Sequence, residues 1–509
     1  MVIPTRIKLL CPVALILGAL SIAGLITLIV LWQTKLSPFQ DYAVVIDAGS
    51  THSKIFVYTW PADKSNGLGL TSRVTQIKSC SPTGAITSIS DPTEENIKSY
   101  FNSAMMTCID VIPSTRKNRA LIFLGATAGL RLFEMKNATY TNALLNGTRT
   151  YFSSLDLLFK APEQQVRIIS GAEEGLSGWI STNILLEELF INNIPSQTYG
   201  VTDMGGASTQ LSFYSPNATY DRFNMSLFDT EYDIYSHSYL CNGAEQFRYV
   251  YLGQIINKAG GSEIIYDPCL QNGFEQNFTY NDIFALPCVR NRSAPLPQFN
   301  ETSYFTFIGT GNYNECVVNI QQRFNTSECT FTTCSFDNVY QPKPIESSLK
   351  FIAISAWYST FNNLAQNVTL LPNKDGNYDF NTTNLTQIKT AMKGICQQPW
   401  SDVSKPDKYR SLLCFNSMYH WTLFEYGYGM NDGNLKNFHI IKTIDNNEIG
   451  WTLGYMINQT NYLEPEYRPA RLLTKGEFGG FVFLCSFFLL VSAIMGFTFI
   501  YFMRRYRDY

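Results

Sequence analysis

Several patterns of well-known catalytic sites are missing from this sequence. It has only four histidines among 509 residues and no Cys-x-x-Cys pair, which argues against a zinc site. No Gly-Lys dipeptide occurs, which excludes a P-loop, and no Gly-x-Ser-x-Gly segment occurs, which leaves serine-hydrolase chemistry without an anchor. The charge is nearly balanced, with 38 basic and 41 acidic side chains and a net charge of −3. This balance gives no reason to expect a nucleic-acid partner.

Long apolar runs are present at both ends of the chain. Leu9 to Trp32 is a run of 24 residues without a charge, and Gly479 to Met503 is a second apolar run. Each is long enough to span a bilayer. Basic residues flank both runs on the side of the chain terminus: Arg6, Lys8, Arg504, Arg505 and Arg507. The positive-inside rule therefore predicts cytosolic ends at 1–8 and 504–509, membrane helices at 9–32 and 479–503, and an extracellular middle at the plasma membrane.

The middle of the chain has the composition of an extracellular domain. Cys11 and Cys485 lie within the apolar runs, so ten of the twelve cysteines remain between them, an even number that indicates a disulfide framework. Twelve Asn-x-Ser/Thr sequons occur from Asn137 to Asn458. They are acceptor sites for N-linked glycans on a domain that faces outward.

Between the apolar runs the sequence predicts an α/β fold with two lobes. Residues 33–40 resemble a short stalk. Residues 41–170 alternate strands with helical segments and form the expected lobe I. Residues 171–441 form lobe II, with a loop-rich, disulfide-containing insertion near 260–340, and residues 442–475 return to lobe I. A chain of this length is too long for one ordinary core.

Two segments of the chain share one design. "YAVVIDAGSTHSKIFVY" contains a strand that ends at Asp47, a glycine turn with Ser and Thr, and a return strand. "GVTDMGGASTQLSFY" repeats this order around Asp203, about one domain length later. A single copy is adequately explained as a plain β-hairpin with a polar tip. The recurrence of Asp, Gly and Ser/Thr in the same order favours a pair of phosphate-binding turns that face each other across a cleft.

The chemistry of these turns suits phosphate. Consecutive backbone N–H groups in a Gly-Ser-Thr turn form a concave anion site, and glycine permits close approach. A carboxylate at the end of each strand suits a hydrated Mg²⁺ or Ca²⁺, which such sites hold through one or two carboxylates and the substrate's phosphates.

Four motifs resemble those of a known enzyme family. "DAGSTHS", "GATAGLR", "GAEEGLSGW" and "DMGGASTQ" resemble the first four apyrase regions of the ecto-nucleoside triphosphate diphosphohydrolases, in the family's order and spacing. A fifth region, "FIAISAWYSTFNNL", matches more loosely, with Trp357 where Phe is more usual. The resemblance covers nearly the whole chain. Two apolar runs and ten cysteines between them are similar to the cell-surface branch.

The resemblance implies an actin/Hsp70-like fold of two ribonuclease-H-like lobes with a nucleotide in the cleft. It implies stepwise removal of the γ- and β-phosphates of extracellular nucleotides, as in purinergic signalling, with Ca²⁺ or Mg²⁺. By position, Asp47 and Asp203 would hold the metal through waters, and Tyr358 would stack on the nucleobase. Glu174 would be the general base, with Ser208 and Gln210 positioning the water. The implied phosphate-binding residues are Gly49, Ser50, Thr51, His52, Ser53, Thr127, Gly205, Gly206, Ala207, Ser208 and Thr209.

The resemblance also implies a disulfide pattern. The pairs would be Cys80–Cys108, Cys241–Cys288, Cys269–Cys316, Cys329–Cys334 and Cys396–Cys414. Partners beyond nucleotides and the lipid bilayer are not indicated, apart from self-association through the apolar segments.

Some of these residues have simpler explanations. Glu173 and Glu174 are also typical first-turn acids that stabilise a helix N-terminus. Adjacent helical residues point about 100° apart, so only one of the two faces a cleft. Arg131 is expected to make an ion pair rather than to contact phosphate, and Trp179 and Trp451 are expected to pack in the core.

Three functions are consistent with the sequence: an ecto-nucleotidase, a phosphotransferase of the same superfamily, and a non-catalytic nucleotide-binding glycoprotein. An acceptor-using kinase needs no base for water, and a pure binder has no need of Glu174, Ser208 and Gln210 together. These arguments favour the nucleotidase.

Overall fold

The computed structural model describes residues 5–34, 36–260, 262–292, 301–365, 376–379, 385–403, 408–445, 447–468 and 471–507. Within it the chain divides into two compact units. The smaller contains Met1–Gln40, Pro61–Asp63 and Glu464–Tyr509, and the larger contains Asp41–Trp60 and Lys64–Leu463.

The larger unit contains a five-stranded sheet with the order β3-β2-β1-β4-β5. The strands are β1 (Gln40–Ala48), β2 (Ser53–Pro61), β3 (Thr75–Cys80), β4 (Leu121–Ala126) and β5 (Val166–Ile168). β2 and β3 pair antiparallel, whereas β1, β4 and β5 are parallel. The run Ala43–Ile46 is apolar throughout because both faces of β1 are covered: Val44 and Ile46 join one core cluster, and Val45 joins another.

A second sheet in the same unit has seven strands in the order β14-β15-β13-β6-β7-β9-β8. The strands are β6 (Gly200–Met204), β7 (Ser208–Tyr214), β8 (Arg222–Leu227), β9 (Thr230–Leu240), β13 (Phe351–Ser355), β14 (Tyr378–Asp379) and β15 (Phe438–Ile440). β6 pairs antiparallel with β7 and parallel with β13. This arrangement confirms the predicted α/β fold.

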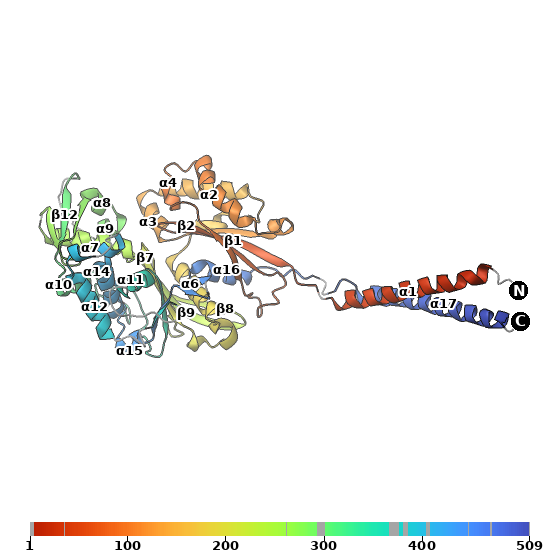
Figure 1. Ribbon diagram of the computed structural model, residues 1–509. Coiled ribbons are helices and arrows are strands. Elements are labelled where there is room, and N and C mark those ends of the chain that lie inside the picture. Colours follow the sequence, from red (N-terminus) through yellow and green to blue (C-terminus); the bar gives the residue numbers. More distant parts are fainter. Residues whose placement is uncertain are drawn as a thin grey trace. The chain divides into compact units, whose positions relative to one another are not determined.

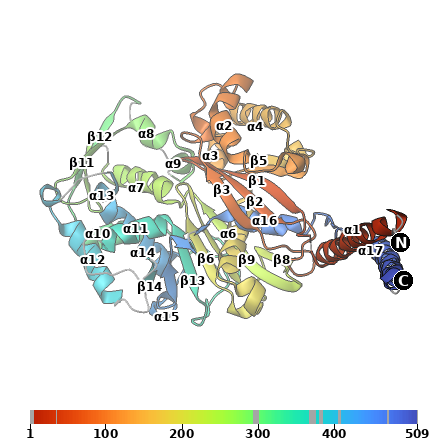
Figure 2. The ribbon, with the colours of Figure 1, turned by 45° about the vertical axis from the view of Figure 1, so that its right-hand side comes forward.

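Two helices lie between the sheets (Figure 2). They are α6 (Gly171–Leu185) and α16 (Trp451–Thr460). One core cluster joins Phe56 and Phe123 of the first sheet to Trp179 of α6, Met456 of α16 and Ile352 of the second sheet. The two helices are in close contact, and the backbone N–H of Gly454 on α16 donates to the Ser181 hydroxyl on α6 at 2.7 Å.

Further helices complete the larger unit. On the first sheet they include α2 (Glu94–Ile109), α3 (Ala128–Lys136), α4 (Ala138–Ser153) and α5 (Pro162–Gln165). Further along the chain are α7 (Ala244–Lys258), α8 (Tyr280–Phe284), α9 (Pro287–Arg292), α10 (Tyr313–Gln321), α11 (Ala356–Ala365), α12 (Leu385–Gln397), α13 (Lys408–Ser411), α14 (Leu413–Thr422) and α15 (Asp432–Leu435). A short hairpin, β16 (Thr443–Ile444) and β17 (Asn447–Glu448), precedes α16.

The segment expected to be loop-rich contains a small sheet of its own. Its strands are β10 (Ile264–Asp267), β11 (Glu275–Thr279) and β12 (Tyr304–Gly309), in the order β10-β12-β11.

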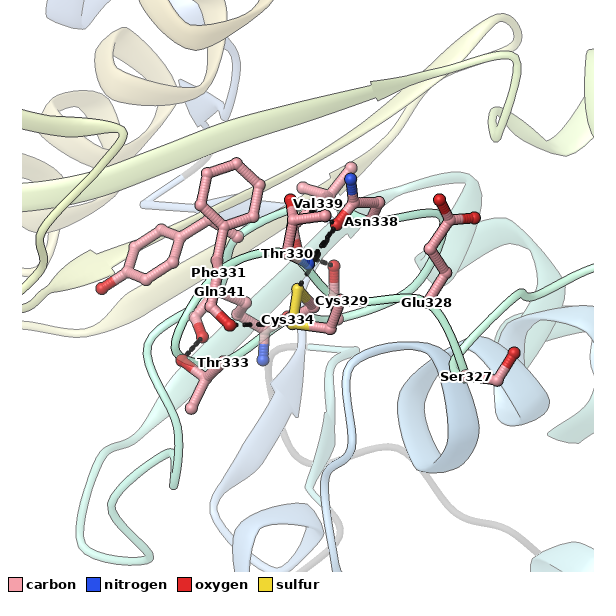
Figure 3. The surroundings of a disulfide bond; sticks show 12 residues. Ser327, Glu328, Cys329, Thr330, Phe331, Thr333, Cys334, Asn338, Val339 and Gln341 are labelled. Atoms are coloured by element: carbon pink, nitrogen blue, oxygen red, sulfur yellow. Dashed lines mark hydrogen bonds between the residues drawn. A yellow bond between two sulfur atoms is a disulfide. The ribbon is translucent and has the colours of Figure 1, made fainter.

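All five disulfides implied by the resemblance are present, Cys80–Cys108, Cys241–Cys288, Cys269–Cys316, Cys329–Cys334 and Cys396–Cys414, and the free cysteines are Cys11 and Cys485. Cys329–Cys334 closes a short surface loop (Figure 3). There the Asn338 side-chain oxygen accepts from the Thr330 N–H at 2.7 Å and from its hydroxyl at 3.0 Å.

The smaller unit contains the two terminal helices, α1 (Thr5–Gln33) and α17 (Lys475–Arg507), which pack side by side (Figure 1). The Ser492 hydroxyl donates to the Ala14 carbonyl at 2.7 Å. At the other end of the pair, the Trp32 and Phe478 rings stack at 4.4 Å. Both helices are long and apolar enough to cross a membrane.

Candidate active site

The two hairpin turns open onto one cavity of about 570 Å³ in the larger unit. Asp47 is the penultimate residue of β1 and Asp203 is the penultimate residue of β6, so each sheet contributes one carboxylate. Twelve of the residues predicted for the site line this cavity: Asp47, Gly49, Ser50, Thr51, His52, Thr127, Glu174, Asp203, Gly205, Gly206, Ala207 and Ser208.

The two turns have the same backbone geometry. The Gly49 N–H donates to the His52 carbonyl at 3.0 Å, and the Gly205 N–H donates to the Ser208 carbonyl at 3.0 Å. The turns also come close to each other, because a Cβ on Gly206 would lie 2.9 Å from the Ser50 hydroxyl. The sequence repeat is therefore a structural repeat, and its two copies face each other.

The aspartates have the free oxygens that a cation needs. Oδ1 of Asp47 and Oδ1 of Asp203 are buried without a hydrogen-bond partner. Burial raises the pKa of Asp47 to about 6; the indole N–H of Trp451 opposes this shift, and the charge of Asp203 adds to it. Burial likewise raises the pKa of Asp203, with partial relief from Ser355.

Such a pair of carboxylates fits a hydrated divalent cation. In the described part of the chain no group of three or more His, Cys, Asp or Glu side chains is arranged to hold a metal. Mg²⁺ in phosphate-handling sites keeps several waters and uses one or two carboxylates, so two unpartnered aspartate oxygens beside the phosphate turns are a suitable donor set. The cation's charge would favour the ionised aspartates.

The first turn of α6 separates its two glutamates. The helix begins after Ser170, whose hydroxyl accepts from the Glu173 N–H at 3.1 Å. Glu173 turns away from the cavity and accepts from Arg167 at 2.8 Å. Glu174 lines the cavity and forms an ion pair with Arg131. The expectations that one glutamate faces the cleft and that Arg131 makes an ion pair are confirmed.

Glu174 has an unusual electrostatic setting. Its pKa rises to about 8, chiefly because burial disfavours the charged carboxylate. The positive charge of Arg131 lowers this pKa, while the charges of Asp203 and Asp47 raise it. A carboxyl with a pKa near neutrality is suited to proton transfer at physiological pH.

Across the cavity a hydrogen-bond network positions Ser208. The Gln210 amide nitrogen donates to the Ser208 hydroxyl at 2.8 Å and to the Ser238 hydroxyl at 3.0 Å. Gln210 is buried and stands behind Ser208 rather than in the cavity lining. Gly175 lets α6 approach here, since a Cβ at this position would lie 3.2 Å from the Gln210 Cβ.

Three other predicted residues lie outside the cavity lining. The Ser53 hydroxyl is buried and accepts from the Tyr100 hydroxyl at 2.8 Å. The Thr209 hydroxyl donates to the Asp203 carbonyl at 2.8 Å and so supports the second turn. Tyr358 is half-buried on α11, and its hydroxyl donates to the Gly376 carbonyl at 3.3 Å.

Several lining residues were not anticipated from the sequence. Lys54 lines the cavity and forms an ion pair with Glu448. Trp451 is buried as expected, but its indole also borders Asp47. Ser355 has a backbone φ of +63°, a rare conformation for a residue other than glycine, and it follows the β13 residue paired with Asp203. Strain of this kind is typical of functional sites.

Known proteins are similar to this chain over nearly its whole length. The sequence model of the GDA1/CD39 (nucleoside phosphatase) family matches residues 34–469. Ectonucleoside triphosphate diphosphohydrolase 1 of Mus musculus is 32% identical over 524 residues, covering 98% of this chain and 97% of that protein. Ectonucleoside triphosphate diphosphohydrolase 3 of Homo sapiens is 31% identical over 481 residues, covering 90% and 86%.

Among solved structures, the nucleoside triphosphate hydrolases of Neospora caninum have the same fold. The match has a TM-score of 0.59 at 15% identity and covers 87% of this chain and 95% of that one.

Proposed function

Because the chain belongs to the GDA1/CD39 (nucleoside phosphatase) family, we propose that it hydrolyses nucleoside triphosphates and diphosphates to monophosphates and inorganic phosphate. The observation that carries this proposal is the pair of equivalent turns, each closed by one glycine N–H, beside two unpartnered aspartate oxygens. Repeated turns suit a substrate with two or three phosphates in a row, because each turn can bind a different phosphate.

Asp47 and Asp203 would hold the cation, Ca²⁺ or Mg²⁺, through its waters. When bound, the cation would offset the charge that develops on the phosphate oxygens. The backbone N–H groups of the turns at 49–53 and 205–209, with Thr127, would bind the phosphates.

Glu174 would act as the general base. Its carboxylate would take a proton from a water, whose oxygen attacks the terminal phosphorus while the bond from that phosphorus to the bridging oxygen breaks. The bonding pair leaves with the shortened nucleotide. Ser208, held by Gln210, would orient the water, and Arg131 would favour the ionised form of Glu174.

Tyr358 remains the proposed nucleobase contact. It lies on α11, which begins directly after Ser355, and both Ser355 and Ala356 line the cavity. An aromatic ring near this edge could stack on a base.

The proposed location is the plasma membrane, with an extracellular active site and both termini in the cytosol. The two terminal helices and the five disulfides support it. We retain 41–170 as lobe I, 171–441 as lobe II and 442–475 as the return to lobe I, and we propose that the terminal helices also permit self-association between copies.

Phosphate release from ATP and from ADP by intact cells expressing the chain tests this function. We expect both nucleotides to be hydrolysed, chelation to stop turnover, and added Ca²⁺ or Mg²⁺ to restore it. Asp203→Asn should lower activity sharply at every cation concentration. Full activity in excess chelator, or none with either nucleotide in an expressed and folded protein, would contradict the proposal.

A further inference from the structure

The sheet β10-β12-β11 has one buried face and one more exposed face, because buried and exposed residues alternate along β10 and β12. On β12, Phe305 and Phe307 are fully buried, whereas Tyr304 is 63% exposed. On β10, Ile264 is 54% exposed and Tyr266 is 68% exposed. We call Ile264, Tyr266 and Tyr304 the outer tyrosine face. Ile264 and Tyr266 are neighbours on the exposed side of β10, and Tyr304 is on the exposed side of β12. Large apolar side chains gathered on one exposed face can mark a surface that another group covers.

A glycosylation sequon lies on the same face. Asn277-Phe278-Thr279 is on β11, and the Asn277 side chain is exposed. Asn277 pairs with Thr306 of β12, and Thr306 pairs with Ile264 of β10. These three residues therefore form one row across the sheet. Since cross-strand partners point to the same side, Asn277 shares the solvent side with the outer tyrosine face.

We propose that Asn277 carries an N-linked glycan whose first sugars cover the outer tyrosine face. The inference rests on the extracellular location proposed above, because the donor for this reaction is used on the lumenal side of the membrane. In the reaction, the Asn277 amide nitrogen attacks the anomeric carbon of a lipid-diphosphate-linked oligosaccharide. A C–N bond forms, the C–O bond to the diphosphate breaks, and the lipid diphosphate leaves with the bonding pair while the amide loses one proton.

The geometry suits this cover. Neighbouring strands are about 4.8 Å apart, so the row from Asn277 to Ile264 spans roughly 10 Å, which the first two sugar rings can cross. The C–H face of a sugar ring packs against an aromatic ring, and its hydroxyls remain in water. Tyrosine offers an apolar ring with a polar edge to such a partner.

A glycan at Asn277 would also keep the exposed face of this small sheet from associating with another copy of the protein. β10 and β11 are the outer strands of the sheet, and an outer strand with exposed apolar side chains invites pairing with another molecule. A bulky polar glycan attached to the outer strand β11 and lying over the face would hinder that approach.

Asn277→Gln is the appropriate variant, because it retains a side-chain amide but removes the asparagine that the sequon requires. Changing Thr279 would also damage α8. The Thr279 hydroxyl accepts from the Asp282 N–H at 3.2 Å and donates to the Asp282 carboxylate at 2.7 Å, which caps that helix. Thr279→Ser retains both the sequon and the cap and serves as a positive control.

Asn224→Gln is a matched control on another strand. Asn224 is an exposed sequon residue on β8 and pairs with Asp233. Its same-face neighbours on β8, Arg222 and Ser226, are exposed and polar. A glycan there would cover no apolar face.

The experiment uses the full chain expressed in cells that attach N-linked glycans. Glycopeptide mass spectrometry measures occupancy at each sequon, and iodination measures tyrosine access. We expect Asn277 to be occupied, and Asn277→Gln to raise iodination of Tyr266 and Tyr304 several-fold and to increase self-association. Tyr462, which is 75% exposed, should react equally in both proteins. Asn224→Gln should leave Tyr266 and Tyr304 unchanged, and ATP hydrolysis should match the parent in both variants.

The outcomes separate this inference from the proposed function. If other sequons are occupied but Asn277 is not, or if Tyr266 and Tyr304 react equally with and without the glycan, the inference is wrong and the nucleotidase proposal is unaffected. If no sequon is occupied, both the inference and the extracellular location are wrong.

Discussion

At the scale of single residues, the structure distinguishes two adjacent glutamates by their partners. Glu173 forms an ion pair with Arg167 and does not line the cavity. Glu174 lines the cavity and forms an ion pair with Arg131. Both pairs lie near the start of α6 and differ in which side of the helix they occupy. The two pairs therefore provide matched variants.

The first prediction concerns the base. Glu174→Gln keeps the shape of the side chain and removes its basicity, so we expect kcat to fall by about 10²-fold or more, with nucleotide binding retained. Glu173→Gln should remain close to the parent. Single-turnover hydrolysis and equilibrium nucleotide binding measure the two effects. A large loss in Glu173→Gln alone would assign the base to the other residue.

The second prediction concerns pH. A general base works when deprotonated, so kcat/KM should rise with pH through the pKa of Glu174. Because Arg131 lowers that pKa, Arg131→Met should move this rise to higher pH, by about one unit or more. Activity lost at neutral pH should then return in alkaline buffer. The profile is measured at saturating cation.

Arg167→Met is the control, since it removes the partner of Glu173. Its pH profile should overlay that of the parent. If Arg131→Met loses activity equally at every pH, Arg131 acts by positioning and not through the protonation of Glu174.

At the scale of elements, the active site depends on the crossing of α6 and α16. A Cβ on Gly454 would lie 2.0 Å from the Ser177 carbonyl and 2.8 Å from the Ser181 nitrogen, both backbone atoms. Trp451, which borders Asp47, begins the same helix α16. The distance between these helices therefore also determines where Trp451 meets the cavity.

We predict that Gly454→Ala destabilises the protein by about 1–3 kcal/mol, because backbone atoms must move to admit the methyl group. Gly178→Ala on α6 is the matched control. A Cβ there meets nothing within 4 Å, so the change should be neutral or stabilise by up to about 1 kcal/mol. Thermal unfolding of the two variants checks the difference. Equal stability of both would mean that the helices can separate without cost.

At the scale of the whole molecule, two disulfides lie within the insertion near residues 260–340 of the larger unit. Cys269–Cys316 closes a separation of 47 residues and both its cysteines are buried, whereas Cys329–Cys334 closes a separation of five at the surface. Chain entropy makes the longer closure more stabilising.

Replacing both cysteines of a pair by serine tests this ranking. We expect a loss of about 4 kcal/mol for Cys269–Cys316 and about 2 kcal/mol for Cys329–Cys334. Thermal inactivation of phosphate release provides the measurement. The reverse order would show that residual structure in the unfolded chain, rather than loop length, controls the effect.

Much of this architecture could be predicted from local sequence. The strands around Asp47 and Asp203, the helix that begins at Gly171 and the even number of cysteines outside the apolar runs are all local patterns, and the structure contains each of them. Repetition of the Asp-Gly-Ser/Thr order was enough to predict that two turns belong to one site. The start of α6 near Glu174 also followed from a local helix signal.

Other features were decided only by the tertiary structure. Lys54 and Glu448 are 394 residues apart, and no local pattern links them. The positive φ of Ser355, the indole of Trp451 beside Asp47 and the position of Gln210 behind Ser208 also depend on which elements pack together. Strand and turn propensities act over a few residues, so the sequence alone determined the hairpins, whereas contacts across the core determined what surrounds them.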